Sequence, residues 1–257
     1  MFRWDPGQYL RYGDERGRPF ADLVARIGAT SPRRVLDLGC GDGGFTASLR
    51  ERWPGAEIVG IDSSEEMISR ARALEGGRLS FRVDDVVSVA PSADFDVVLS
   101  NAVFQWVAEH AGVIRRWADT LAPGAWIAFQ VPGNFDSPSH RLMRQLASSD
   151  RWAPLLPPDV LRHHDVVRTP GEYAGVLLDA GWTADAWETT YSHLLPGEDP
   201  VLDWVRGTGL RPVLAALADG DADRFCAEFG PLLREAYPGG PHGTFFDFRR
   251  VFCVAHR

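Results

Sequence analysis

The strongest candidate for chemistry in this chain is a run of closely spaced glycines. Gly39, Gly41 and Gly43 follow the strand-like segment Arg34–Leu38, and a helical stretch begins at Gly44. Because glycine has no Cβ, such a turn lets a ligand approach the backbone, and the N–H groups at the start of the helix can bind its polar atoms. The spacing therefore predicts a ligand-binding turn between a strand and a helix.

Two carboxylates accompany this turn. Asp37 lies two positions before Gly39, inside the predicted strand, and Asp62 lies at the end of the next strand, where an acid can accept hydrogen bonds from both hydroxyls of a ribose. Gly39, Gly41 and Gly44 also satisfy the GxGxxG fingerprint of a nicotinamide dehydrogenase, which by itself is a weak signal. Asp37 favours a ligand with a cationic amino group instead, because a carboxylate there would repel a pyrophosphate.

Acids and amides follow the next strands as well. Asp84 and Asp85 come directly after the third strand-like segment, where a carboxylate can accept from an adenine amino group and the N–H of Val86 can serve a ring nitrogen. Asn101 and Gln105 follow the fourth segment in the same way. Since the carboxyl ends of parallel strands meet at one edge of the sheet, we expect a single ligand to lie across these groups.

These groups require strands that run in one direction. Strand-like segments alternate with helical ones through the first half of the chain, which is typical of a parallel α/β sheet. The predicted strands span 34–38, 57–61, 79–83, 95–100 and 125–131, and the predicted helices 44–52, 64–74 and 110–121. The expected fold class is therefore α/β and Rossmann-like.

The second half of the chain does not continue the regular alternation of strand-like and helical segments. Prolines interrupt residues 132–158, which predicts an insertion made of short pieces. A helix is predicted at 171–180, followed by strands at 183–194 and 244–255 with helices between 200 and 237. We expect an amino-terminal lid segment at 1–30, a ligand-binding core at 31–135, and the remaining core strands within 136–257, with an inserted helical cap at about 136–168 and 196–242.

Composition excludes several classes of function. The formal net charge is −8, whereas nucleic-acid binding normally needs a basic surface. All 27 basic residues are arginine, so neither Schiff-base chemistry nor a phosphate-loop lysine is available. Cys40, Cys226 and Cys253 are far apart, and His163 and His164 show no metal-ligand spacing with acids or cysteines. We therefore expect no disulfide framework, no metal and no nucleic-acid partner.

The hydrophobic pattern also predicts where the protein works. No stretch approaches the roughly 20 apolar residues that a membrane span needs, and the first residues lack the apolar core of a signal peptide. We expect a cytoplasmic protein without a membrane partner, with a monomer as the default oligomeric state.

Motifs spread over nearly the whole chain carry a family resemblance. They are Trp4-x-Pro6-x-x-Tyr9-Leu10, Glu15-Arg16-x-Arg18-Pro19, Asp37-Leu-Gly-Cys-Gly41, Arg52-Trp-Pro54, Gly60-Ile-Asp-Ser-Ser64, Met67-Ile68, Asn101-Ala102, Gln105-Trp106, Thr189-Thr-Tyr191-x-His193, Asp203-Trp-Val205 and Thr208-Gly-Leu-Arg-Pro212. With these motifs the chain resembles the class I S-adenosylmethionine-dependent methyltransferases and, more narrowly, the bacterial trans-aconitate 2-methyltransferase family. One departure is Asp42, where the family's glycine loop usually carries proline.

The resemblance implies a mostly parallel seven-stranded sheet with an antiparallel last strand and a helical cap. It also implies S-adenosylmethionine as the methyl donor and S-adenosylhomocysteine as the product. The family's single acid on the third strand aligns with Asp85 rather than Asp84. The residues assigned to the cofactor are Asp37, Gly39, Gly41, Gly43, Asp62, Ser63, Asp85, Val86, Asn101 and Gln105.

The acceptor that the resemblance implies is a small polycarboxylate, trans-aconitate. Carboxylates of this kind are ionised at neutral pH, so the nucleophile needs no general base and no acid–base catalytic residue is predicted. Arginine forks, hydroxyls and rings that suit such an anion are Tyr9, Arg18, Trp106, Tyr191, His193, Arg206 and Arg211, with Arg249 and Arg250 as further candidates.

Three alternatives stay open at the level of sequence. A methyltransferase for malonyl acyl-carrier protein resembles this chain in Asn101 and Gln105-Trp106. A nicotinamide dehydrogenase shares the glycine pattern, and a ligand-sensing module could keep the fold without chemistry. A comparison of thermal stabilisation by S-adenosylhomocysteine and by NAD would separate the methyltransferases from the dehydrogenase.

Overall fold

The computed structural model describes residues 13–158, 160–161 and 166–257, and these form two compact units. The core unit comprises Arg16–Pro132, Val167–Thr189 and Arg250–Arg257. The helical unit comprises the described residues of 1–15 and 133–166 together with Thr190–Arg249. The chain passes between the units several times, because the last two strands each contribute residues to both.

A seven-stranded sheet has the strand order β3-β2-β1-β4-β5-β7-β6. Its strands are β1 (Arg34–Leu38), β2 (Glu57–Asp62), β3 (Leu79–Val83), β4 (Val97–Asn101), β5 (Trp126–Pro132), β6 (Thr183–Leu195) and β7 (Thr244–His256). The pairings from β3 through β5 are all parallel, and β7 is antiparallel to β5. The predicted mostly parallel sheet with an antiparallel last strand is confirmed. The central strands are buried on both faces, as their near-continuous apolar sequences require.

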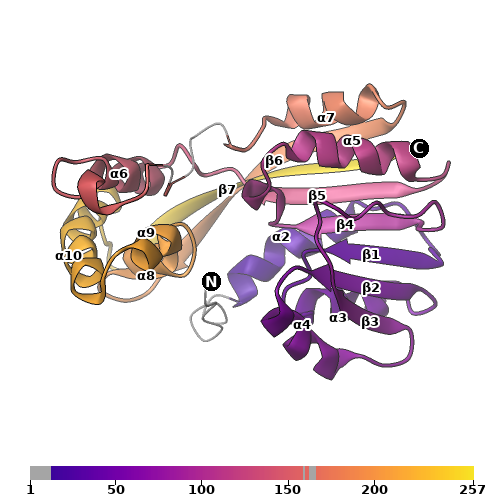
Figure 1. The fold of residues 1–257 in the computed structure, drawn as a ribbon, viewed down its shortest axis with the longest axis horizontal. Coiled ribbons are helices and arrows are strands. Elements are labelled where there is room, and N and C mark those ends of the chain that lie inside the picture. The colour runs from indigo at the N-terminus through magenta and orange to yellow at the C-terminus, as the bar shows by residue number, and fades with distance from the viewer. Residues whose placement is uncertain (1–12, 159, 162–165) are drawn as a thin grey trace. The chain divides into compact units, whose positions relative to one another are not determined.

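Helices of the core unit precede β1 and separate most of the successive strands (Figure 1). They are α2 (Gly13–Ala25), α3 (Gly44–Arg52), α4 (Glu65–Ala71), α5 (His110–Thr120) and α7 (Pro170–Leu178), with short 3-10 turns at Arg72–Leu74 and Phe104–Trp106. Helix α4 is capped by Ser64, whose hydroxyl accepts from the N–H of Met67 at 3.3 Å. Thus the βαβ succession read from the sequence is present.

Helices α5 and α7 lie side by side (Figure 1) and are joined by a buried hydrogen bond. The Tyr173 hydroxyl lies 3.0 Å from Nε2 of His110, whose Nδ1 lies 3.0 Å from the carbonyl of Val107. Because a carbonyl only accepts, Nδ1 carries the proton and Nε2 accepts from the tyrosine. Burial lowers the pKa of His110, which agrees with this neutral form. This histidine is a structural group rather than a metal ligand.

The helical unit has its own apolar core. It contains α6 (Pro138–Ala147), a 3-10 turn at Ala153–Leu155, α8 (Pro200–Arg206), α9 (Arg211–Ala216) and α10 (Asp219–Ala236). Trp152, Trp204, Phe225 and Phe229 are fully buried in it. The elements within residues 132–158 are short, as the prolines predict, and Pro138 lies in the first turn of α6, where its fixed φ favours a helix start.

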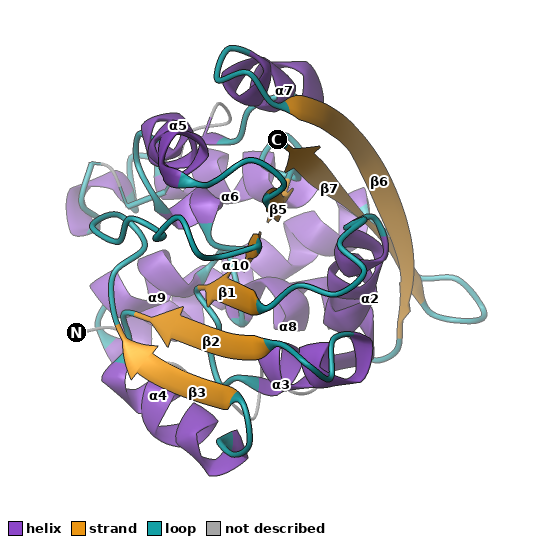
Figure 2. Ribbon diagram, turned by 90° about the vertical axis from the view of Figure 1, so that its right-hand side faces the viewer, coloured by secondary structure: helices purple, strands orange, loops and turns teal. Residues whose placement is uncertain are grey.

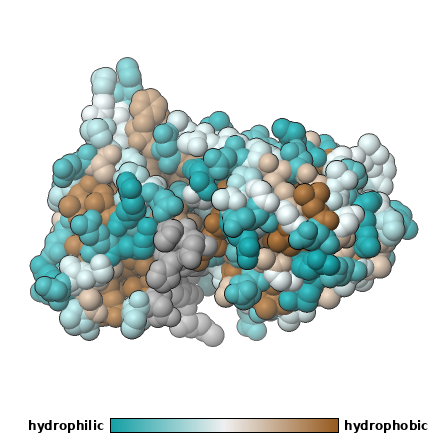
Figure 3. Space-filling model, turned by 90° about the horizontal axis from the view of Figure 1, so that it is seen from above, coloured by the Kyte–Doolittle hydropathy of each residue, from teal (hydrophilic) through white to brown (hydrophobic). Residues whose placement is uncertain are grey.

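The surface carries hydrophilic and hydrophobic side chains together. On the face drawn in Figure 3, hydrophobic groups are interspersed among hydrophilic ones. Within the described residues, no helix is both long enough and apolar enough to cross a bilayer.

Candidate functional site

The glycine turn after β1 is fastened to the neighbouring strand. The N–H groups of Gly39 and Cys40 donate to the carbonyl of Ile61, at 2.8 and 2.9 Å. Gly39, Gly41 and Gly43 have φ of 78°, 58° and 80°, a left-handed conformation that favours glycine. The sequence pattern therefore reflects a real conformational need of this turn.

The glycines differ in what surrounds them. A Cβ on Gly39 would overlap Cγ2 of Val103, and one on Gly43 would lie 2.6 Å from the ring of Phe81. A Cβ on Gly41 would meet no atom of the described residues within 4 Å. Gly39 and Gly43 are thus required for packing, whereas Gly41 borders open space in which a ligand can approach the loop.

Asp62 joins the end of β2 to this turn. Its Oδ2 accepts from the N–H of Gly41 at 2.9 Å, and its Oδ1 accepts from the N–H of Ser64 at 2.9 Å. Each carboxylate oxygen has a further lone pair, so the side chain can still accept from ligand hydroxyls. The structure brings Asp62 and the glycine turn together as predicted, while the adjacent Ser63 is exposed.

Asp37 is the most unusual carboxylate of the site. It is 2% exposed, its Oδ2 accepts from the Thr46 hydroxyl at 2.5 Å, and its Oδ1 has no hydrogen-bond partner among the described residues. Burial raises the pKa of Asp37 to about 7, against the opposing effect of the Thr46 hydrogen bond, and the charge of Asp62 raises it further. A buried acceptor without a donor is costly, so this oxygen favours a cationic or N–H-bearing ligand group.

The acids after β3 have different surroundings. Asp84 accepts from Nε of Arg82 at 3.3 Å and from the N–H of Asp85 at 2.9 Å. Asp85 is exposed, and its Oδ1 accepts from the N–H of Val87 at 2.8 Å. Asp84 is therefore engaged by a neighbouring cation, which favours Asp85 as the acid that meets a ligand. Val86 lies in the turn that Asp85 starts.

The end of β4 forms a strained turn. Ala102 has φ of 59°, which is uncommon for a residue with a side chain, and its N–H donates to the carbonyl of Gln130 at 2.9 Å. Nε2 of Gln105 donates to the carbonyl of Ala102 at 2.5 Å, so this predicted cofactor residue also holds the turn. Trp106 is 53% exposed and does not belong to the core.

Sequence reasoning missed a buried polar group beside this turn. Gln130 on β5 is 1% exposed and donates through Nε2 to Oδ1 of Asn101 at 2.5 Å, while Nη1 of Arg250 donates to its Oε1 at 3.4 Å. Arg250, named above only as a further candidate for the acceptor, is itself buried. A glutamine inside an otherwise apolar strand is the signal that could have identified this group.

The predicted acceptor residues are divided between the two units. Tyr191 and His193 are buried in the helical unit with stacked rings 6.3 Å apart, and His193 also stacks on Trp204 at 5.0 Å. Arg206 ends α8 and Arg211 begins α9, both half-buried. Arg18 is exposed on α2 in the core unit, and Tyr9 lies outside the described residues.

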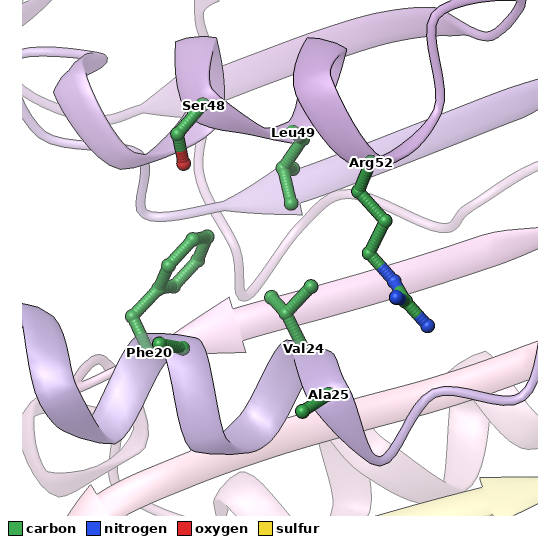
Figure 4. A pocket seen from close by; sticks show the side chains of 7 residues that line it. Phe20, Val24, Ala25, Ser48, Leu49 and Arg52 are labelled. Carbon is green, nitrogen blue, oxygen red and sulfur yellow. The ribbon is translucent and has the colours of Figure 1, made fainter.

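A hollow of about 260 Å³ lies elsewhere in the core unit, between α2 and α3. In Figure 4, Phe20 and Val24 from α2 face Leu49 from α3, with Arg52 at one side. None of the predicted cofactor residues lines it. This hollow is an apolar gap between two helices, separate from the polar strand ends.

Figure 2 shows β1, β2 and β3 pointing the same way, so their carboxyl ends, which carry the glycine turn, Asp62 and Asp85, share one edge. Among the described residues no group of three or more His, Cys, Asp or Glu side chains is arranged to hold a metal. An acid at each of these strand ends beside an open glycine turn suits an adenosyl ligand with an aminoacyl end.

Comparisons with known proteins agree with this geometry. A family model for a methyltransferase domain matches residues 12–186. Solved structures with a similar fold include an S-adenosylmethionine-dependent methyltransferase from Mesorhizobium loti (TM-score 0.51, 20% identity, 92% of this chain and 96% of that one). Another is a phosphoethanolamine N-methyltransferase from Haemonchus contortus with S-adenosylmethionine (TM-score 0.56, 16% identity, 93% and 52%). Fold and site thus define a class I S-adenosylmethionine-dependent methyltransferase.

Curated relatives identify the family within this class of methyltransferases. Trans-aconitate 2-methyltransferase from Streptomyces avermitilis is 55% identical over 99% of this chain and 97% of its own length. The protein of that name from Mycolicibacterium gilvum is 56% identical over 98% of both. This chain belongs to the trans-aconitate 2-methyltransferase family.

Proposed function

We propose that this protein transfers the methyl group of S-adenosylmethionine to a carboxylate of trans-aconitate, giving the monomethyl ester and S-adenosylhomocysteine. The observation that carries the proposal is the identity of more than half of all positions, over nearly full length, to relatives named for this reaction. A cytoplasmic monomer without a metal is part of the same proposal.

The residues at the strand ends fit the cofactor. Asp62 would accept from the ribose hydroxyls and Asp85 from the adenine amino group, with the N–H of Val86 serving a ring nitrogen. The unpartnered Oδ1 of Asp37 would face the ammonium of the aminoacyl end. The open space beside Gly41 leaves the loop accessible to the ligand. The three carboxylates and the open space beside Gly41 thus each have a matching group on the ligand.

When bound, the cofactor supplies a methyl group on a positively charged sulfur, which is electrophilic. The chain's task is then to hold an ionised acceptor carboxylate in line with that methyl and to exclude water. Arg206 and Arg211 are the cations proposed for the acceptor, together with Arg18, while the buried rings of Tyr191 and His193 shape the helical unit. No side chain needs to remove a proton from the acceptor.

Binding of S-adenosylhomocysteine at neutral pH is expected to release protons from Asp37. Without ligand the pKa of Asp37 is raised to about 7, so much of it is protonated at and below that pH. A ligand ammonium favours the carboxylate and lowers that pKa, so the proton leaves. Titration calorimetry at pH 6.5 to 7 in buffers of different ionisation enthalpy measures the released fraction.

The control for this prediction is Asp37→Asn, which keeps the shape and removes the titrating group. Its binding heat should no longer depend on the buffer, and its affinity for S-adenosylhomocysteine should be lower. A buffer-independent heat in the unmodified protein would show that Asp37 does not meet the ammonium.

Arg211→Ala is expected to raise the KM for trans-aconitate about tenfold, because a charge-assisted hydrogen bond to a carboxylate is worth roughly 1.5 kcal/mol or more. Affinity for S-adenosylhomocysteine should stay unchanged, and Arg211→Lys should rescue only in part. A matched control is Arg224→Ala, which removes an exposed arginine of the same unit that pairs with Asp221.

A methyl-transfer assay on a panel of acceptors tests which acid is methylated. Labelled S-adenosylmethionine is incubated with trans-aconitate, cis-aconitate, isocitrate and malonyl acyl-carrier protein. Labelling of the carrier protein without labelling of trans-aconitate would refute the acceptor and leave the methyltransferase assignment standing.

A further inference from the structure

We infer that Arg250 and Gln130 are positioning residues that fix the side-chain amide of Asn101 with its NH2 group outward, as a hydrogen-bond donor for a ligand carboxylate. The inference deepens the proposed function and rests on it. Gln130 is not among the residues predicted for the cofactor or the acceptor, and Arg250 was named only as a further candidate for direct contact with the acceptor.

The argument starts from the arginine, whose guanidinium can only donate hydrogen bonds. Nη1 of Arg250 lies 3.4 Å from Oε1 of Gln130, so this atom must be the carbonyl oxygen of the amide. The other end of the Gln130 amide is then its NH2 group. Burial of both residues removes water that could otherwise compensate a reversed amide.

The orientation of the Gln130 amide in turn determines that of the Asn101 amide. Nε2 of Gln130 lies 2.5 Å from Oδ1 of Asn101, and a donor there requires an acceptor opposite it. The Asn101 side chain therefore turns its oxygen toward β5, which leaves Nδ2 as a donor. Among the described residues Nδ2 has no hydrogen-bond partner, and it is not one of the fully buried unsatisfied atoms.

The place of Asn101 in the sheet indicates the ligand group. It is the last residue of β4, next to β1, whose end carries the glycine turn, and opposite Gln130 of β5. The adenosine-directed acids Asp62 and Asp85 follow the strands on the other side of β1. A donor on β4 thus lies toward the aminoacyl and methyl end of the ligand, where the groups that accept hydrogen bonds are carboxylates.

Two carboxylates meet this description: that of the cofactor's aminoacyl end and that of the acceptor. Both would gain from the outward NH2 group, and the positive charge of Arg250 at the far end of the chain of amides polarises each hydrogen bond in the same sense. The test must therefore measure both ligands separately.

Gln130→Glu is the decisive variant, because it changes one NH2 group into an oxygen with little change of shape. Glutamate can still accept from Arg250 but cannot donate to Asn101, so the Asn101 amide should reverse and present its oxygen to the ligand. An oxygen facing a carboxylate repels it, and the affinity for the ligand concerned should fall tenfold or more.

The readout is calorimetric affinity for S-adenosylhomocysteine and for methylthioadenosine, which lacks the aminoacyl group, together with the KM for trans-aconitate. A loss of S-adenosylhomocysteine affinity with unchanged methylthioadenosine affinity assigns Asn101 to the cofactor carboxylate. A raised KM with unchanged affinity for both nucleosides assigns it to the acceptor. Equal weakening of all three ligands is what a merely structural role produces, and it would overturn the inference.

A second variant guards against a folding defect. Asn101→Asp keeps an acceptor for Gln130 and removes the outward donor without altering the buried pair of Gln130 and Arg250, so it should reproduce the ligand-specific loss. Unchanged binding and kinetics in both folded variants overturn the inference alone. Failure of the unmodified protein to bind S-adenosylhomocysteine or to methylate any carboxylate overturns the proposed function and the inference with it.

Discussion

Asp62→Ala is expected to weaken binding of S-adenosylhomocysteine by about 1.5 to 3 kcal/mol, because a charged acceptor for ligand hydroxyls is lost from a half-buried site. By the usual conversion this is roughly a tenfold to hundredfold change in Kd. The structure adds a second reason, since Asp62 also accepts from the N–H groups of Gly41 and Ser64 and so holds the glycine turn. Titration calorimetry on the folded variant measures the loss.

Asp84→Ala is the matched control for Asp62→Ala. It removes a carboxylate from the next strand end that is engaged by Arg82, and its effect on affinity should be small. Thermal unfolding should show both variants folded. Wild-type affinity in folded Asp62→Ala would show that this acid is not the ribose ligand.

Gly39→Ala and Gly41→Ala are expected to act on different properties although both glycines have positive φ. At either position alanine costs about 1 to 2 kcal/mol of backbone strain. At Gly39 the new methyl also overlaps Val103, which adds about 1 to 3 kcal/mol of overpacking. At Gly41 the methyl enters open space that the ligand would occupy. Gly39→Ala should therefore lose more stability and Gly41→Ala more ligand affinity.

Denaturant unfolding and calorimetry on the same two variants test this contrast. Comparable losses of stability would mean that Val103 yields easily to the added methyl. Undiminished S-adenosylhomocysteine affinity in Gly41→Ala would remove this glycine from the ligand contact.

The sheet and its ligand edge follow from local sequence. Segments rich in β-branched residues and leucine, which predict strands, alternate with amphipathic segments, which predict helices. The rules for connecting parallel strands then allow few strand orders in the sheet. The glycines at 39, 41 and 43 needed no knowledge of the fold, because a left-handed turn is a property of the residues themselves. For the same reason, the bounds of β1, α3 and β3 agree with their predicted ranges.

The state of individual polar groups depended on tertiary contacts. Asp37 was predicted as a ligand group, but its lack of a second partner and its raised pKa come from burial between strands distant in sequence. The start of α6 at Pro138 depends instead on a local property, because the fixed φ of proline suits the first turn of a helix.

The sequence by itself determined the order of strands and helices, the glycine turn and the acids at the strand ends, because each depends on residues close together in the chain. Only the tertiary structure decided that Gln130 lies against Asn101, 29 positions away along the chain, and that Arg250 lies against Gln130, 120 positions away. Each of these side chains sets which end of its neighbour's amide donates the hydrogen bond. The side chains come from β4, β5 and β7, so they meet only when these strands are assembled side by side. The orientation of a single amide is therefore a property of the folded sheet.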